Sequence, residues 1–302
     1  MYQETKMKFL SFAINDKKKS YGIYNGAGII DLGARLSLKY PNLKALLEAD
    51  HGLEEASHHA GEPEDFDLES VQFLPVIERP NKILCVGMNY AEKRVEFGET
   101  NAAPTLFVRF PDSQTGHDST VLKPAFTNEF DYEGELAVII GKSGLYIPEE
   151  QALDYVAGYS CYMDGSVRDW QHSWFTAGKN WEKTGSFGPW MVTSDEIPDP
   201  GQLRLQTFLN GQRMQDDNTA NLIHSVPKLL AYISTFTKLS PGDVIITGSP
   251  GGVGKKRNPP IFMKEGDLIE IEIEKIGRLR NCIAEAQVEA ANMPQAPLAE
   301  VI

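Results

Sequence analysis

The chain has 302 residues, 41% of them hydrophobic, and a formal net charge of −13 at pH 7. That length and hydrophobic content are enough to bury a sizeable core in one or two domains. The acidic balance repels phosphate backbones and anionic membrane surfaces, so we expect neither nucleic acid nor a membrane as partner, and any anionic substrate must be met by local cations.

The sequence also bears on the cellular compartment. No apolar stretch reaches the roughly 18 residues of a membrane span, and the first residues, 1–6, have no apolar signal-peptide region. The three cysteines, Cys85, Cys161 and Cys282, are an odd number and each has apolar neighbours, which favours reduced core thiols over a disulfide framework. We therefore expect a cytosolic (cytoplasmic) protein.

A small N-terminal domain is predicted for residues 1–75. Residues 7–14 and 20–31 have the pattern of short strands, and residues 41–48 have the pattern of a helix. Residues 50–68 are acidic, contain adjacent histidines and lose periodicity, which predicts a solvated loop, with metal binding by the histidines as the alternative. A larger catalytic domain, residues 76–302, then follows.

The strongest functional signal is a pair of acidic residues on a strand pattern, where an apolar run directly follows Glu133 and Glu135. Side chains at i and i+2 point to the same face about 7 Å apart, so the glutamates converge, while Leu136, Val138 and Ile140 point to the other face. Carboxylates this close repel each other, and a divalent cation held by oxygen ligands, Mg²⁺ first and Mn²⁺ or Ca²⁺ next, relieves that repulsion. A solvated strand edge is the alternative.

A third acid, Asp164, ends a second apolar and aromatic run and completes a set of three carboxylates for a metal. Arg168 and Gln171 follow it at spacings of four and seven, which predict that the three side chains share one helical face. A metal, a cation and an amide would then line one wall of a site.

Strand patterns dominate the rest of the chain and predict a mainly β domain with few helices, an α+β fold. Residues 203–214 carry an Asn-Gly hairpin turn at 210–211, and residues 267–274 alternate apolar and acidic positions. One helix is predicted at residues 225–236, with Ser225 as N-cap. Its predicted buried stripe consists of Leu229, Leu230, Ile233 and Phe236.

The glycine-rich stretch 247–254 is not predicted to be a phosphate loop. It lacks the Gly-Lys-Ser/Thr ending of a P-loop and the helix that a dinucleotide-binding fold requires. Its glycines would instead let the backbone approach a substrate closely.

Several motifs, in order, give the chain a resemblance to the fumarylacetoacetate hydrolase family over roughly residues 80–285. They are Val86-Gly-Met-Asn-Tyr90, Tyr132-Glu-Gly-Glu-Leu136, Asp164-Gly-Ser-Val-Arg-Asp-Trp-Gln171, Gly178-Lys-Asn-Trp181, Phe187-Gly-Pro-Trp190 and the segment from Pro241 to Gly254. The resemblance implies the mixed β-sandwich roll of that family and its habit of forming homodimers.

The resemblance also implies roles for individual residues. Glu133, Glu135 and Asp164 would hold the metal. Lys179 and Arg168 would neutralise developing negative charge, while the residues expected to bind substrate are Gln171, Ser249, Arg109 and Tyr90. Surface exposure is the alternative for Lys179, and a plain edge-strand position is the alternative for Arg109.

A carboxylate-bound cation suits chemistry on 1,3-dicarbonyl compounds and 2-oxo acids, because it stabilises an enolate. The leading expectation is metal-dependent hydrolysis of a C–C bond in a 2,4-dioxo acid such as an acylpyruvate or fumarylpyruvate, as in the breakdown of aromatic compounds. The alternatives are a decarboxylase, a tautomerase or isomerase, or a dehydratase of a 2-oxo acid, and a binding protein that has lost catalysis.

One departure from the family affects the mechanism. Hydrolytic members carry a histidine and a glutamate three residues apart in a lid helix; here Glu96 is present, but Lys93 stands at the histidine position. A lysine takes a proton from water only if its pKa is strongly lowered. We therefore expect Lys93 to bind a substrate carboxylate, kept protonated by neighbouring Glu96, with activation of water as the alternative.

Overall fold

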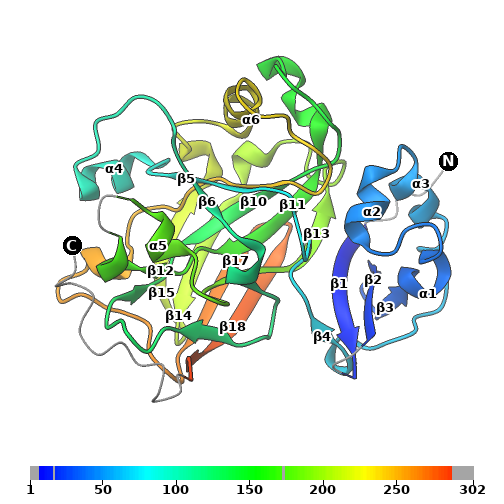
Figure 1. Ribbon diagram of the computed structural model, residues 1–302, viewed down its shortest axis with the longest axis horizontal. Helices are drawn as coiled ribbons and strands as arrows, with labels where there is room; N and C mark the ends of the chain where they lie inside the picture. The colour runs from blue at the N-terminus through cyan, green and yellow to red at the C-terminus, as the bar shows by residue number, and fades with distance from the viewer. Residues whose placement is uncertain (1–6, 16–17, 172–173, 288–302) are drawn as a thin grey trace.

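The structure, a computed structural model, describes residues 7–15, 18–171 and 174–287. Two β-sheets form the framework of the described chain, with short helices around them (Figure 1). The larger sheet has eleven strands, and nine of them follow the order β3-β2-β1-β13-β11-β10-β16-β5-β6, while β4 pairs with β1 and β7 with β13. These strands are β1 (Lys8–Ile14), β2 (Lys18–Tyr24), β3 (Ile29–Asp31), β4 (Gln72–Phe73), β5 (Ile83–Gly87), β6 (Thr105–Arg109), β7 (Gln114–Thr115), β10 (Gly134–Ile140), β11 (Val156–Met163), β13 (Gly185–Thr193) and β16 (Val244–Ile246).

The second sheet has five strands in the order β15-β14-β17-β18-β8. Its members are β8 (Val121–Lys123), β14 (Arg204–Leu209), β15 (Gln212–Asn218), β17 (Leu268–Ile273) and β18 (Gly277–Glu285). A separate pair joins β9 (Phe130–Asp131) to β12 (Ser166–Val167). The mainly β fold expected from the sequence is confirmed.

The helices are short. They are α1 (Leu32–Leu36), α2 (Leu43–Glu48), α3 (Gly52–Ser57), α4 (Ala91–Phe97), α5 (Thr176–Lys179) and α6 (Val226–Ser234). Single turns of 3-10 helix lie at η1 (Leu68–Ser70), η2 (Pro111–Ser113), η4 (Arg168–Trp170), η5 (Pro200–Gln202), η6 (Thr219–Asn221) and η7 (Gly254–Lys256), and η3 (Glu149–Tyr155) is longer. No helix among the described residues is long and apolar enough to cross a membrane.

Strand β10 separates two hydrophobic cores. Leu136, Val138 and Ile140 pack into the core shared with the five-stranded sheet, whereas Ala137 and Ile139 face the core covered by α2 and α3. The alternation predicted for this strand is therefore confirmed, and Glu135 lies on the Ala137 face. Gly134 allows the sheets to approach, because a Cβ at this position would lie 2.2 Å from the Thr207 hydroxyl oxygen.

The N-terminal strands extend the main sheet. Strand β1 pairs antiparallel with β13, so the strands at the right of Figure 1 continue the sheet that carries β10 and β11. The predicted division into residues 1–75 and 76–302 stays a prediction. Residues 50–68 are not a plain loop, because α3 forms there and buries Ala56 against α2. His59 contacts Glu62 at 2.7 Å and belongs to no metal-binding group among the described residues.

Two further predictions are confirmed in part. The hairpin between β14 and β15 turns at Asn210 and Gly211, both with positive φ, as a type I′ turn requires. Helix α6 follows Ser225 and buries the predicted stripe except for Phe236, which lies beyond the helix end and is 58% exposed.

The three cysteines are free, but Cys282 is exposed instead of buried, since it lies on the outward face of β18.

Candidate metal centre and substrate pocket

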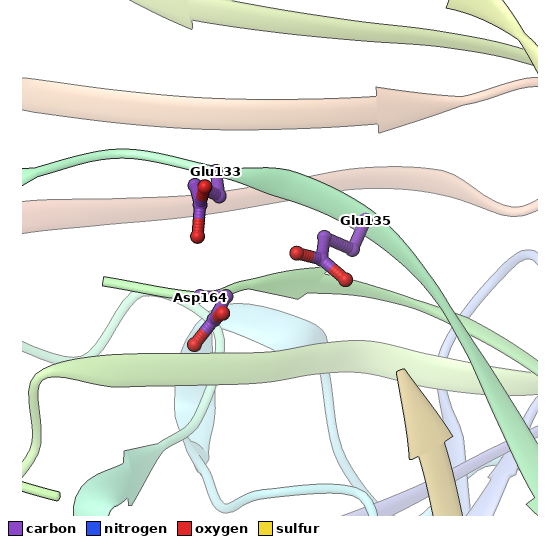
Figure 2. A group of neighbouring side chains, drawn as sticks. All are labelled: Glu133, Glu135 and Asp164. Carbon is purple, nitrogen blue, oxygen red and sulfur yellow. The ribbon is translucent and has the colours of Figure 1, made fainter. Parts of the chain in front are cut away.

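Three buried carboxylates meet where β10 and β11 lie side by side. Asp164 follows the last residue of β11 and donates its backbone N–H to the Glu133 carbonyl at 2.8 Å. Glu135 pairs with Tyr162 in the ladder between β10 and β11. It lies two residues after Glu133 and so shares its face of the chain. One carboxylate oxygen from each of Glu133, Glu135 and Asp164 lies within 4.8 Å of the other two. Figure 2 shows the three carboxylates gathered at one place.

Basic side chains surround Glu133. Lys179, at the end of α5, donates to Glu133 Oε2 and to Asp164 Oδ2 at 2.5 Å each. Arg168 donates to Glu133 Oε1 at 3.0 Å and to Asp131 Oδ2 at 2.8 Å. Both cations are buried, so Lys179 does not take its alternative place on the surface.

The two glutamates differ in their electrostatic surroundings. Burial by itself raises the pKa of a carboxyl, but at Glu133 the neighbouring Arg168, Lys179 and Lys93 outweigh burial and hold the pKa well below its ordinary range. Burial, reinforced by Asp164 and Glu133, raises the pKa of Glu135 well above its ordinary range. Glu135 Oε2 accepts one hydrogen bond, from the Gly248 N–H at 2.6 Å.

This arrangement fits a divalent cation. Three carboxylates from two adjacent strands supply the all-oxygen ligands that Mg²⁺, Mn²⁺ and Ca²⁺ prefer. Glu135 is left without a cationic hydrogen-bond partner among the described residues, and the carboxylates of Glu133 and Asp164 lie beside it. A cation beside Glu135 would supply positive charge to these carboxylates.

Arg109 holds Asp164 rather than substrate, which corrects its predicted role. Its side chain is fully buried, and all five of its N–H donors are used. They go to Asp164 Oδ1 and the Gly165 carbonyl, to the hydroxyl and carbonyl of Ser113, and to the Thr184 hydroxyl. Although β6 is an edge strand, this residue points inward and orients one of the three clustered carboxylates.

Lys93 reaches the acids from α4. Its ammonium donates to Glu133 Oε1, and to Ser249 Oγ at 2.6 Å. Glu96 does not contact it; Glu96 Oε1 instead accepts from the Gly252 N–H at 2.9 Å. The carboxylate that pairs with Lys93 is therefore Glu133 and not the expected Glu96, which is held by the backbone of Gly252.

The segment after Asp164 is not helical. Ser166 and Val167 form β12 against β9, and Arg168–Trp170 make a single 3-10 turn. The shared helical face predicted for Asp164, Arg168 and Gln171 is thus wrong, because the backbone of Ser166 and Val167 bonds to another strand. Arg168 and Gln171 are nevertheless in contact, since Arg168 donates to Gln171 Oε1 at 3.2 Å. The Gln171 amide nitrogen is buried and has no partner among the described residues.

A small pocket opens onto the acids. It is lined by Val86, Gly87, Met88, Lys93, Phe107, Glu133, Glu135, Arg168, Phe175, Lys179 and Ser249. Tyr90 and Gln171 are not among these residues, and the substrate-binding roles expected of both stay predictions. The Tyr90 hydroxyl is buried without a partner among the described residues, and burial raises its pKa.

Sequence reasoning missed Asp131. Its carboxylate pairs with Arg168 and also accepts from the Gly254 and Lys255 N–H groups at 2.7 and 3.1 Å. A signal was present, because Asp131, Glu133 and Glu135 share the period of two that was used for the glutamates alone.

Comparison with known proteins identifies the family. The family described as "Fumarylacetoacetate (FAA) hydrolase C-terminal" matches residues 82–284. The chain belongs to the fumarylacetoacetate hydrolase family. A bovine protein named oxaloacetate tautomerase FAHD2B, mitochondrial, is 36% identical over 265 residues, which is 85% of this chain and 84% of that protein.

Solved structures of proteins named as hydrolases are also similar to this chain. A fumarylacetoacetate hydrolase from Exiguobacterium antarcticum is 32% identical, has a TM-score of 0.75, and covers 93% of this chain and 100% of its own. The maleylpyruvate hydrolase of Sphingobium sp. SYK-6, in complex with manganese(II) and pyruvate, is 28% identical, with a TM-score of 0.79 and the same two coverages. The family thus includes hydrolases and tautomerases, which supports an enzymatic role and a divalent-cation site.

Proposed function

We propose that this chain is a divalent-cation-dependent enzyme that interconverts the keto and enol forms of a dicarboxylic 2-oxo acid of the oxaloacetate type. Tautomerisation stands among the alternatives that the sequence left open. It is favoured over hydrolysis because the bovine relative is named an oxaloacetate tautomerase and because Lys93, not histidine, faces the acids.

The charge balance of the buried cluster carries the proposal. Four acidic and four basic side chains are buried together there: Asp131, Glu133, Glu135, Asp164, Lys93, Arg109, Arg168 and Lys179. When all are ionised their charges cancel, so a bound divalent cation leaves two positive charges in excess. A dianionic substrate neutralises that excess, whereas a neutral or singly charged one does not.

The cation would act as a Lewis acid that polarises the 2-oxo group. Lys179 and Arg168 add positive charge beside Glu133, and this charge stabilises an anionic enolate more than a neutral ketone. The unpartnered amide nitrogen of Gln171 is available to donate to a substrate oxygen.

Tautomerisation also requires a proton to arrive at or leave C3. The side chain of Lys93 is ordinarily an ammonium group, which has no lone pair with which to activate water but can donate a proton. In the enol-to-keto direction, Lys93 supplies the proton to C3 while the enol hydroxyl releases its proton to water, and water then returns a proton to Lys93. Ser249 fixes the ammonium in place.

C–C bond hydrolysis of an acylpyruvate-like acid is the second candidate. Its support is the similarity to maleylpyruvate hydrolase, a structure that holds manganese(II) and pyruvate. In this chain, however, the two groups at the positions of the hydrolytic dyad point to different partners, Lys93 to Glu133 and Glu96 to Gly252.

A product analysis tests the proposal. Purified protein with Mg²⁺ or Mn²⁺ is mixed with the enol form of oxaloacetate, and proton NMR follows the carbon skeleton. We expect faster conversion to the keto form, no loss of carbon, and loss of the effect on chelation of the metal. Cleavage of an acylpyruvate without an effect on oxaloacetate would support hydrolysis instead, release of CO₂ would indicate a decarboxylase, and binding without turnover would indicate an inactive member.

Three expectations from the sequence stay predictions. These are Mg²⁺ as the physiological cation, the homodimer, and the cytosolic location.

A further inference from the structure

The ring of Phe97 lies among three cations. It stands at the end of α4, and Lys93 Nζ and Arg168 Cζ each lie 5.8 Å from the ring centroid. Lys256 Nζ lies closer, at 4.4 Å. Lys93 and Arg168 are buried and line the pocket, whereas Lys256 is exposed. The ring therefore connects the inner cations of the site with a cation that faces water.

The backbone next to Lys256 is anchored to the site. Lys256 ends η7, and the Gly254 and Lys255 N–H groups both donate to Asp131, the partner of Arg168. The side chain of Lys256 thus extends from a fixed base beside the acids, and the Phe97 ring below it restricts its head further through a cation–π contact.

Lys255 and Lys256 differ in their partners. The Lys255 ammonium lies 2.9 Å from Glu129, but Lys256 forms no ion pair with a carboxylate in the part of the chain that the structure describes. Of the three cations around the ring, Lys93 and Arg168 already pair with buried carboxylates, so an anion would gain most beside Lys256. The position is therefore suited to a carboxylate that enters with the substrate.

We propose that Lys256, held over Phe97, binds the distal carboxylate of a dicarboxylic 2-oxo acid and so makes the enzyme prefer dicarboxylic over monocarboxylic substrates. This inference rests on the proposed function. The reacting end of the substrate lies at the acids, and the far end leaves the pocket past Phe97 to meet Lys256.

The test compares oxaloacetate with its C4 methyl ester, which keeps the enol and removes only the distal charge. In the Mg²⁺-loaded enzyme, Lys256→Gln should lower the ratio of kcat/KM for oxaloacetate to that for the ester about tenfold, through KM, because a charge-assisted hydrogen bond is lost. Lys256→Arg should restore the ratio. The matched control is Lys255→Gln, which removes the same charge one residue away and should leave the ratio as it is.

An unchanged ratio in Lys256→Gln, or an equal fall in Lys255→Gln, would overturn the inference. The proposed function would still hold in that case, provided that the enzyme turns over oxaloacetate. If the unmodified enzyme turns over neither compound, calorimetry with oxaloacetate and its ester measures binding directly. A preference for the diacid that Lys256→Gln removes would then support the subsite although the proposed reaction had failed. Equal binding of both compounds by the unmodified protein would overturn it.

Discussion

Glu135 lies on β10, Glu133 directly precedes that strand and Asp164 directly follows β11. The cations that face these acids come from α4, α5 and the turn after β12. The acids are placed by strand register, since Gly134 pairs with Met163 and this pairing brings Glu133 beside Asp164. The cations are placed by side-chain contacts between distant segments, as with Lys93 and Ser249. The acidic half is therefore part of the core, whereas in the cationic half the position of Lys93 depends on how α4 and the glycine-rich stretch meet.

The largest effect is expected when a carboxylate of the acidic half is replaced. Glu135→Gln keeps an acceptor for the Gly248 N–H but removes a ligand charge, so the dissociation constant for Mg²⁺ should rise at least about a hundredfold, and activity should be lost. Without metal, the melting temperature should stay the same or rise, because an ionised Glu135 repels Asp164 and Glu133.

Calorimetry and thermal unfolding check this prediction, with Glu272→Gln on the half-exposed face of β17 as the control. Unchanged Mg²⁺ affinity in Glu135→Gln would show that the acids do not form the cation site.

Removal of Lys179 tests the cation that links both halves. Lys179→Met should lower kcat about a hundredfold, because charge next to the developing enolate is lost. It should also reduce the free energy of unfolding by about 3 kcal/mol, since Glu133 and Asp164 lose a buried partner. Steady-state kinetics and urea unfolding measure the two effects. Lys183→Met, at a more exposed lysine, is the control, and normal turnover in Lys179→Met would contradict the assigned role.

Replacement of Lys93 should change the Mg²⁺ affinity less than Glu135→Gln does, and in the opposite direction. Its ammonium occupies Glu133 Oε1, an oxygen that a metal would also use, so Lys93→Met should tighten Mg²⁺ binding about tenfold while tautomerisation falls. Lys255→Met, which removes a cation outside the acid cluster, should leave the affinity as it is. Weaker Mg²⁺ binding in Lys93→Met would mean that Lys93 supports the metal instead of competing with it.

The smallest effect is expected at Glu96. Glu96→Gln keeps an acceptor for the Gly252 N–H, so kcat should change less than about threefold. If Glu96 instead helped to activate water, the same variant would lose about a hundredfold or more in kcat. Stopped-flow measurement of enol loss distinguishes these outcomes.

The sequence was most informative where one local pattern sufficed. The period of two predicted that Glu133 and Glu135 converge, and the Asn-Gly pair predicted the hairpin at residue 210. Helix α6 was predicted from its apolar stripe, although Phe236 lies past its last turn and so is not buried.

It was least informative where a contact joins distant segments. Nothing in the sequence around Arg109 indicates that all its donors will be used by Ser113, Asp164, Gly165 and Thr184. The spacing of Arg168 from Asp164 suggested a helix, but pairing with β9 decided the conformation. The partner expected for Lys93 from its neighbours in the sequence was Glu96. Its carboxylate partner in the structure is Glu133, forty positions away.

A crystal structure with Mn²⁺, located by its anomalous scattering, tests the central claim most directly. The account predicts one peak bound by Glu133, Glu135 and Asp164 together, with Lys93 Nζ no longer on Glu133 Oε1. The absence of a peak at these carboxylates at saturating Mn²⁺, with Lys93 and Lys179 still paired to Glu133, would contradict it.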